Sequence, residues 1–220
     1  NICIILIYTG LDRLYNRLYF AVGAALKPLN FEEVPAKMQF RRTNKGGYSS
    51  VVLSAGGRQP TEVEVFLGIR INLVEELIYQ FTSGLTGYGP YSATLLVPTR
   101  KIAPEFPYFY SLATNADIPV IVPQIMQFLI QRGWTFLEKY HSVKSLDALY
   151  NQEPTQKSPY LTNEFHRALR GIVLAKLAQR PDWEHLVKQY QSNLHKKVIP
   201  ETQMQNYARL ANFLRYHSFS

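Results

Sequence analysis

The stretch that decides the fold reads Thr-Glu-Val-Glu-Val-Phe-Leu-Gly-Ile-Arg-Ile, residues 61–71. Its apolar residues fall at every second position: Val63, Val65, Leu67, Ile69 and Ile71. Successive side chains of a β-strand point to opposite faces, so these residues share one face. The other face is mostly polar, which is typical of an antiparallel strand with one buried side. A helix would scatter the same residues around its circumference, so the pattern predicts a strand.

Further strands are predicted on both sides of this one. Residues 38–43 and 48–54 precede it, and the first three strands form a meander. Residues 44–47 join the first pair, and their glycines favour a bulged hairpin because glycine adopts positive φ without a Cβ clash. Residues 55–60 form the second turn. Residues 91–97 form a fourth strand after the next helix.

At Asn72 the apolar period changes from 2 to 3.6, which predicts a helix. Its apolar stripe consists of Leu73, Val74, Leu77, Ile78 and Phe81. Asn72 is suited to cap the helix, because its side-chain oxygen can accept a hydrogen bond from an otherwise unpaired amide. Glu75 lies at the capping-box position, near the positive end of the helix dipole. We expect this helix to lie across the apolar face of the sheet.

Helical patterns occupy the start of the chain and all of its last third. Residues 11–27 form an amphipathic helix before the first strand. Later helices are predicted within 119–140 and over 145–151, then after caps at Thr162 and Asp182, and finally from about 201, with Met204, Ala208, Ala211 and Leu214 on one side.

The predicted fold class is α+β. An antiparallel sheet of four or five strands carries helices on one face, and a helical C-terminal region follows. The sequence divides into a sheet domain over residues 1–115 and a helical region over 116–220. One continuous domain is the alternative.

Composition indicates a globular protein. The chain has 220 residues, 46% of them hydrophobic, and a formal net charge of +8. A single cysteine, Cys3, excludes an internal disulfide, so we expect a reducing, cytoplasmic setting and an inert buried thiol. The apolar run over residues 1–8 is far shorter than the ~20 residues of a spanning helix, and its flanks do not match a signal peptide.

Motifs with specific chemistry are not found. Gly84, Gly87 and Gly89 follow a helix, whereas a phosphate cradle lies between a strand and a helix N-terminus. The histidines show no spacing that would converge on a metal ion. We therefore expect no catalytic, metal or cofactor site, and an enzyme of unfamiliar type is the alternative.

The polar face of the sheet and an aromatic loop are the candidate partner-binding surface. Its residues are Arg41, Tyr48, Glu62, Glu64, Phe66, Arg70, Tyr108 and Tyr110. Tyr and Trp are favoured at protein interfaces. The alternative is structural: Gln39 and Arg41 would pair with Glu62 and Glu64 across strands, and the aromatic residues would close the end of the core.

The order of elements resembles a loosely defined bacterial group of α+β domains. The resemblance covers roughly residues 11–140 and rests on the segments 40–48, 63–70 and 72–81. Some members are suggested to be immunity proteins of polymorphic toxin systems. The resemblance implies a non-enzymatic bacterial protein that binds another protein, as an immunity or neutralising factor. It assigns no catalytic residue. Nucleic-acid binding, motivated by the positive charge, is the alternative.

Overall fold

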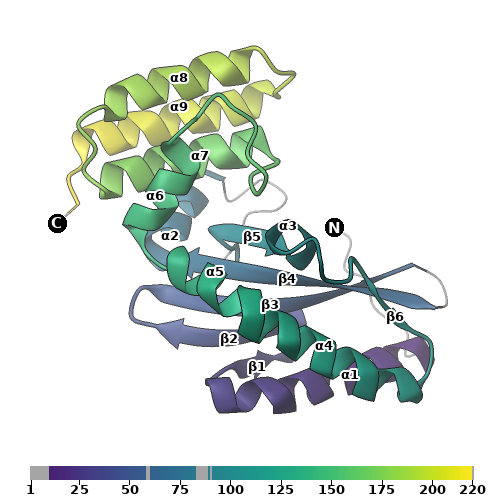
Figure 1. The fold of residues 1–220 in the computed structure, drawn as a ribbon. Helices are drawn as coiled ribbons and strands as arrows, with labels where there is room; N and C mark the ends of the chain where they lie inside the picture. The colour runs from purple at the N-terminus through teal and green to yellow at the C-terminus, as the bar shows by residue number, and fades with distance from the viewer. Residues whose placement is uncertain (1–9, 58–59, 83–88, 90, 220) are drawn as a thin grey trace. The chain divides into compact units, whose positions relative to one another are not determined.

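The computed structural model describes residues 10–57, 60–82, 89 and 91–219. The chain divides into two compact units (Figure 1). Unit 1 consists of Asn1–Asn44, Tyr48–Gly68 and Leu96–Glu138. Unit 2 consists of Lys45–Gly47, Ile69–Leu95 and Lys139–Ser220. This division differs from the predicted one at residue 115, because each unit is assembled from separate segments of the chain.

The sheet has six strands in the order β1-β2-β3-β4-β5, and β6 pairs with β4. Their bounds are β1 Glu32–Val34, β2 Gln39–Asn44, β3 Gly47–Gly56, β4 Thr61–Ile71, β5 Leu95–Pro98 and β6 Tyr110–Leu112. The sheet is antiparallel, as predicted. Glu33 of β1 lies opposite Phe40 of β2, and Val63 of β4 lies opposite Tyr110 of β6. Because β3 occupies one edge of β4, β5 and β6 share its other edge.

Strand β4 has the alternation that its sequence predicts. Val63, Val65, Leu67 and Ile69 are at most 2% exposed, whereas Glu62 is exposed. The pattern ends before Ile71, which is only half-buried. The predicted strand over 91–97 is shorter than expected, since β5 begins at Leu95.

The connection between β2 and β3 is tighter than the predicted bulged loop. Only Lys45 and Gly46 lie between the two strands. Gly46 O accepts a hydrogen bond from Asn72 N at 2.7 Å. A Cβ on Gly47 would lie 1.8 Å from Arg70 O, so glycine is required here for close backbone approach.

Helices α1 (Gly10–Leu26) and α4 (Ile118–Phe128) pack together in unit 1. Tyr19 of α1 stacks on Phe40 of β2 with ring centroids 4.5 Å apart, and its hydroxyl donates to Gln39 O. Unit 1 also contains the short helix α3 (Thr99–Ile102). Helices α1 and α4 therefore pack against each other, and α1 also packs against β2 of the sheet.

A single π-helical turn, Leu129–Gly133, joins α4 to α5 (Trp134–Lys139). The sequence predicts a bend or break at Gly133. A Cβ on Gly133 would lie 3.3 Å from Leu67 Cδ1, so this turn packs on β4. The helix begins at Ile118, and Pro123 lies inside it.

Helix α7 (Glu164–Leu177) is the centre of unit 2. It contacts α2 (Asn72–Thr82), α6 (Val143–Asn151), α8 (Trp183–His195) and α9 (Glu201–Tyr216). Helix α2 contacts α7 and α9 of the same unit. Periodicity identifies a buried face without saying what covers it.

The helix starts of unit 2 agree only in part with the predicted caps. Ser142 caps α6 and accepts a hydrogen bond from Ser145 N. Asn163 caps α7, whereas Thr162 was predicted to do so. Asp182 is the N-cap residue of α8, but its carboxylate accepts hydrogen bonds from Arg180.

The inner face of α9 is partly the predicted one. Tyr207, Leu210, Ala211 and Leu214 are buried, whereas Ala208 is exposed. No helix within the described ranges has both the length and the apolar character needed to cross a membrane. The predictions for residues 1–8, Cys3 among them, and for Gly84 and Gly87 concern positions outside those ranges.

Replacing Gly47 by alanine should destabilise the protein. The new methyl group would meet the Arg70 carbonyl, so backbone must move, at a cost of roughly 1–3 kcal/mol. Urea unfolding followed by circular dichroism measures the loss. Gly56→Ala is the control, because nothing lies within 4 Å of its Cβ position. Equal stabilities for the two variants would contradict the close approach at Gly47.

Candidate functional site

The structure separates the predicted surface residues by burial. Tyr48, Arg70 and Tyr110 are buried, with exposed fractions of 7%, 6% and 3%. Arg41, Glu64 and Phe66 are half-buried, and Glu62 and Tyr108 are exposed. The eight predicted residues therefore cannot all contact a partner together, because three of their side chains are buried.

Arg41 and Tyr48 form a local pair between β2 and β3. The guanidinium carbon of Arg41 lies 4.1 Å from the centre of the Tyr48 ring. Arg41 Nε donates to Gln39 Oε1 at 2.9 Å. This cation–π contact gives both residues a role in stabilising the sheet.

Glu64, Arg100, Tyr108 and Phe109 form a connected group in unit 1, here called the aromatic surface. Arg100 Nη1 donates to Glu64 Oε1 at 2.5 Å. The Arg100 guanidinium carbon lies 3.8 Å from the centre of the Tyr108 ring. Tyr108 meets Phe109 edge to face, with ring centroids 4.3 Å apart.

The aromatic surface combines exposure with fixed geometry. Tyr108 is 50% exposed and Phe109 is 39% exposed. The cation–π contact and the ion pair restrict the Tyr108 ring before any partner arrives. Glu62, which lies opposite Ser111 in the β4–β6 register, is also exposed. Two predicted residues, Glu64 and Tyr108, are thus brought together by a third, Arg100, that the sequence did not single out.

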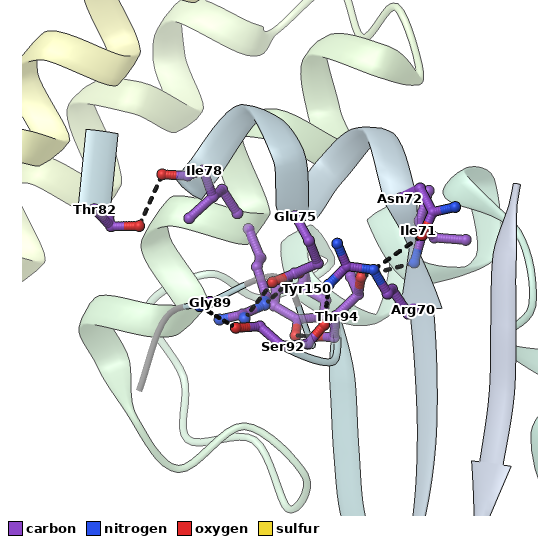
Figure 2. A network of polar contacts seen from close by, with 11 residues as sticks. Arg70, Ile71, Asn72, Glu75, Ile78, Thr82, Gly89, Ser92, Thr94 and Tyr150 are labelled. Atoms are coloured by element: carbon purple, nitrogen blue, oxygen red, sulfur yellow. Dashed lines mark hydrogen bonds and ion pairs between the residues drawn. The ribbon is translucent and has the colours of Figure 1, made fainter. Parts of the chain in front are cut away.

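Arg70 belongs to a network at the end of β4 (Figure 2). It donates to Asn72 Oδ1 at 2.9 Å and to Ser92 O at 2.5 Å. Thr94 Oγ1 accepts from Ile71 N, and Thr94 O accepts from the Tyr150 hydroxyl. Arg70 therefore holds residues 92–94 against the start of α2. Asn72 is the first residue of α2, and its side-chain oxygen accepts a hydrogen bond from Arg70.

Glu75 and Arg170 form a buried ion pair between α2 and α7. Arg170 Nε donates to Glu75 Oε1 at 2.9 Å, and Nη2 donates to Oε2 at 2.8 Å. Glu75 is 2% exposed and Arg170 is 5% exposed. The sequence predicts a capping-box role for Glu75 in the first turn of the helix. Its charge is instead inside unit 2, where bidentate pairing compensates for lost hydration.

Arg167 donates hydrogen bonds to backbone carbonyls of unit 2. It donates to Tyr150 O, Glu153 O and Gln156 O. These carbonyls lie at and beyond the C-terminal end of α6, where backbone acceptors lack helical partners and a cation is favourable. Arg167 thereby holds the segment that joins α6 to α7.

Tyr190 completes the interior of unit 2. Its hydroxyl donates toward Tyr150 O and Asn151 Oδ1, and Asn151 Nδ2 donates to Asp147 Oδ1 and Gly171 O. Burial raises the pKa of Tyr150 and of Tyr190, so both hydroxyls stay protonated and can donate. The buried groups bind one another, which is the arrangement of a structural core.

His166 lies on α7 beside this interior. Burial lowers its pKa to about 4, and the positive charge of Arg170 adds to the effect. The histidine is therefore neutral at physiological pH. Among the described residues, no group of three or more His, Cys, Asp or Glu side chains is placed to hold a metal ion.

Comparison with protein-family models, with curated proteins and with solved structures finds no match for this chain. The resemblance to immunity-type domains therefore stays a prediction, and the geometry described above is what supports a functional proposal.

Removing Arg170 should strongly destabilise unit 2. Arg170→Met leaves the Glu75 carboxylate buried beside an apolar side chain, at a cost of roughly 3–5 kcal/mol in the free energy of unfolding. The double variant Glu75→Leu/Arg170→Met should recover much of that loss, because no unpaired charge remains. Urea unfolding measures both.

The control is Arg215→Met, which breaks the exposed pair of Arg215 with Glu184. It should cost no more than about 1 kcal/mol. If Arg170→Met were as mild as this control, the buried pair would not stabilise unit 2.

Acid should destabilise the protein partly through His166. Its pKa in the folded chain, about 4, lies below the ordinary 6.5, so the unfolded chain takes up the proton first. Stability linked to His166 is complete above pH 6.5 and is lost as pH falls toward 4. Unfolding titrations at several pH values should show a smaller acid loss for His166→Gln than for the native chain. Identical pH profiles would refute the prediction.

Proposed function

We propose that this chain is a protein-binding module and that the aromatic surface contacts its partner. The observation that carries the proposal is the way Arg100 holds Tyr108 while it pairs with Glu64. Tyrosine and arginine dominate the energetics of protein interfaces. A side chain that is already ordered loses less conformational entropy on binding, so more of its contact energy appears as affinity.

The exposed area around Tyr108 and Phe109 supports the same proposal. Both rings leave a large fraction of their apolar surface in water, and covering that surface is favourable. Glu62 and Glu105 are exposed acidic residues of the same unit, and Glu105 pairs with Arg132. An apolar centre with charged residues nearby is the usual composition of a transient interface.

A neutralising factor of the bacterial immunity-protein type is the specific form that we propose. The order of helices and strands over residues 11–140 supports it through resemblance. The single cysteine in the sequence supports a reducing, cytoplasmic setting for it.

Net charge alone is a weaker basis for function, because many arginines are engaged within the protein. They pair with carboxylates, donate to polar oxygens or lie over aromatic rings: Arg17, Arg41, Arg42, Arg70, Arg100, Arg132, Arg167, Arg170, Arg180 and Arg215. The arginines that pair with carboxylates have their charge compensated locally, so they add less to a positive surface than the net charge implies.

Truncating the aromatic surface should abolish partner capture. The tagged native chain and the variant Tyr108→Ala/Phe109→Ala would be exposed to a lysate of the native host at physiological salt. Loss of two interface anchors should weaken binding by on the order of 30-fold or more. Quantitative mass spectrometry would compare what each protein retains.

The matched control is Val120→Ala/Ile130→Ala, which trims exposed apolar side chains elsewhere in unit 1. This control should capture the partner as the native chain does. Capture that is equal for all three proteins, or absent for the native chain, would defeat the proposal. Thermal unfolding would verify that the variants remain folded.

A further inference from the structure

Helices α8 and α9 form an antiparallel hairpin in unit 2. Arg215, near the end of α9, donates to both carboxylate oxygens of Glu184, near the start of α8. Tyr207 donates to Val187 O at 2.9 Å. The inner faces are buried, and both helices contact α7. The outer face of each helix is exposed.

The outer face of this hairpin is strongly basic. From His185 to the end of the sequence the only acidic residue is Glu201, whereas the cations are Lys188, Lys196, Lys197, Arg209 and Arg215. All of these cations are exposed. Arg215 is neutralised by Glu184. We define the basic face as Lys188, Lys196, Lys197 and Arg209.

Acidic side chains make three described contacts with residues of the hairpin, and in one of them Glu201 Oε1 accepts from Gln205 Nε2 at 3.4 Å. Glu184 is occupied by Arg215, as stated above. Glu164 of α7 accepts from Asn193 Nδ2 at 3.3 Å. Neutral donors and acceptors are also exposed on these helices: Gln191, Ser192, Gln205 and Asn212. The basic face therefore keeps a net positive field.

Helix dipoles explain only part of this charge. Lys196 and Lys197 follow the carbonyl end of α8, where cations stabilise a helix. Lys188 lies in the second turn of α8, and Arg209 lies in the middle of α9. The dipole effect falls off within one turn of a helix end, so it gives no reason for a cation at either position.

We propose that the basic face of the α8–α9 hairpin binds the phosphate backbone of a nucleic acid. Lys and Arg, together with Gln, Asn and Ser, are the side chains that contact phosphates and sugars. Lys188 and Lys196 lie about 12 Å apart along the helix axis. That span covers roughly three or four phosphates of one strand at about 3.4 Å each.

A membrane surface fits the basic face less well than a nucleic acid does. Helices that lie in a membrane interface bury a continuous apolar face in the lipid. The outward side chains of α8 and α9 are mainly polar, with Val198 and Tyr216 as the exposed large apolar residues of this region. The proposal concerns unit 2 alone and is independent of the aromatic surface in unit 1.

Charge reversal on the basic face tests the proposal. Fluorescence anisotropy would follow short labelled RNA and duplex DNA with the native chain and with Lys196→Glu/Lys197→Glu, between about 50 and 200 mM salt. The native chain should bind more weakly as salt rises. The variant should lose at least about tenfold in affinity, and its log–log salt slope should fall by about 2, or 0.9 for each lost phosphate contact.

The control is Lys144→Glu/Lys157→Glu, which changes net charge equally at exposed positions of unit 2 outside the hairpin. Native-like binding by this control supports the basic face. An equal loss in both variants, or no binding by the native chain at the lowest salt, overturns the proposal. Binding to phosphatidylserine vesicles or to an acidic protein without binding to either nucleic acid also overturns it. Retained nucleic-acid binding by Tyr108→Ala/Phe109→Ala would separate this site from the aromatic surface.

Discussion

Backbone pairing along both edges of β4 is the constraint on which the rest of unit 1 depends. Strand β3 occupies one edge, and β5 and β6 share the other. Pairing of Val63 with Tyr110 fixes which face of β6 is buried. The same register leaves Glu62 exposed and directs Glu64 toward Arg100. The aromatic surface is therefore a consequence of strand register, because one residue of slip would exchange its polar and apolar faces.

In unit 2, the pairing of buried charged side chains is the main constraint on the structure. An unpaired carboxylate or guanidinium inside a protein is costly, so only helix arrangements that join Glu75 to Arg170 are favourable. The hydrogen bonds of Arg167 restrict the packing further, because the carbonyls at the end of α6 and after it must lie close to its guanidinium group. Apolar stripes alone would allow several packings of these helices. The buried polar contacts select one of them.

Local patterns in the sequence were enough to predict the fold class but not the contacts between distant segments. The alternation in residues 61–71 depends on near neighbours, and the strand that it predicts is confirmed. Glu75 and Arg170 are 95 residues apart, so no local pattern could show that Glu75 is buried. Arg100 lies 36 residues from Glu64 and was missed for the same reason. Strands β1 and β6 are too short, at 3 residues each, to show a period.

Hydrogen–deuterium exchange of the native chain tests the central claim, that β4 is paired along both edges. Slow exchange requires backbone amides that open only in global unfolding. The account predicts the slowest exchange in unit 1 at residues 63–68, and protection also at 110–112, where β6 pairs with β4. Exchange of residues 63–68 as fast as that of the irregular segment 152–159 would contradict the sheet and the surface built on it.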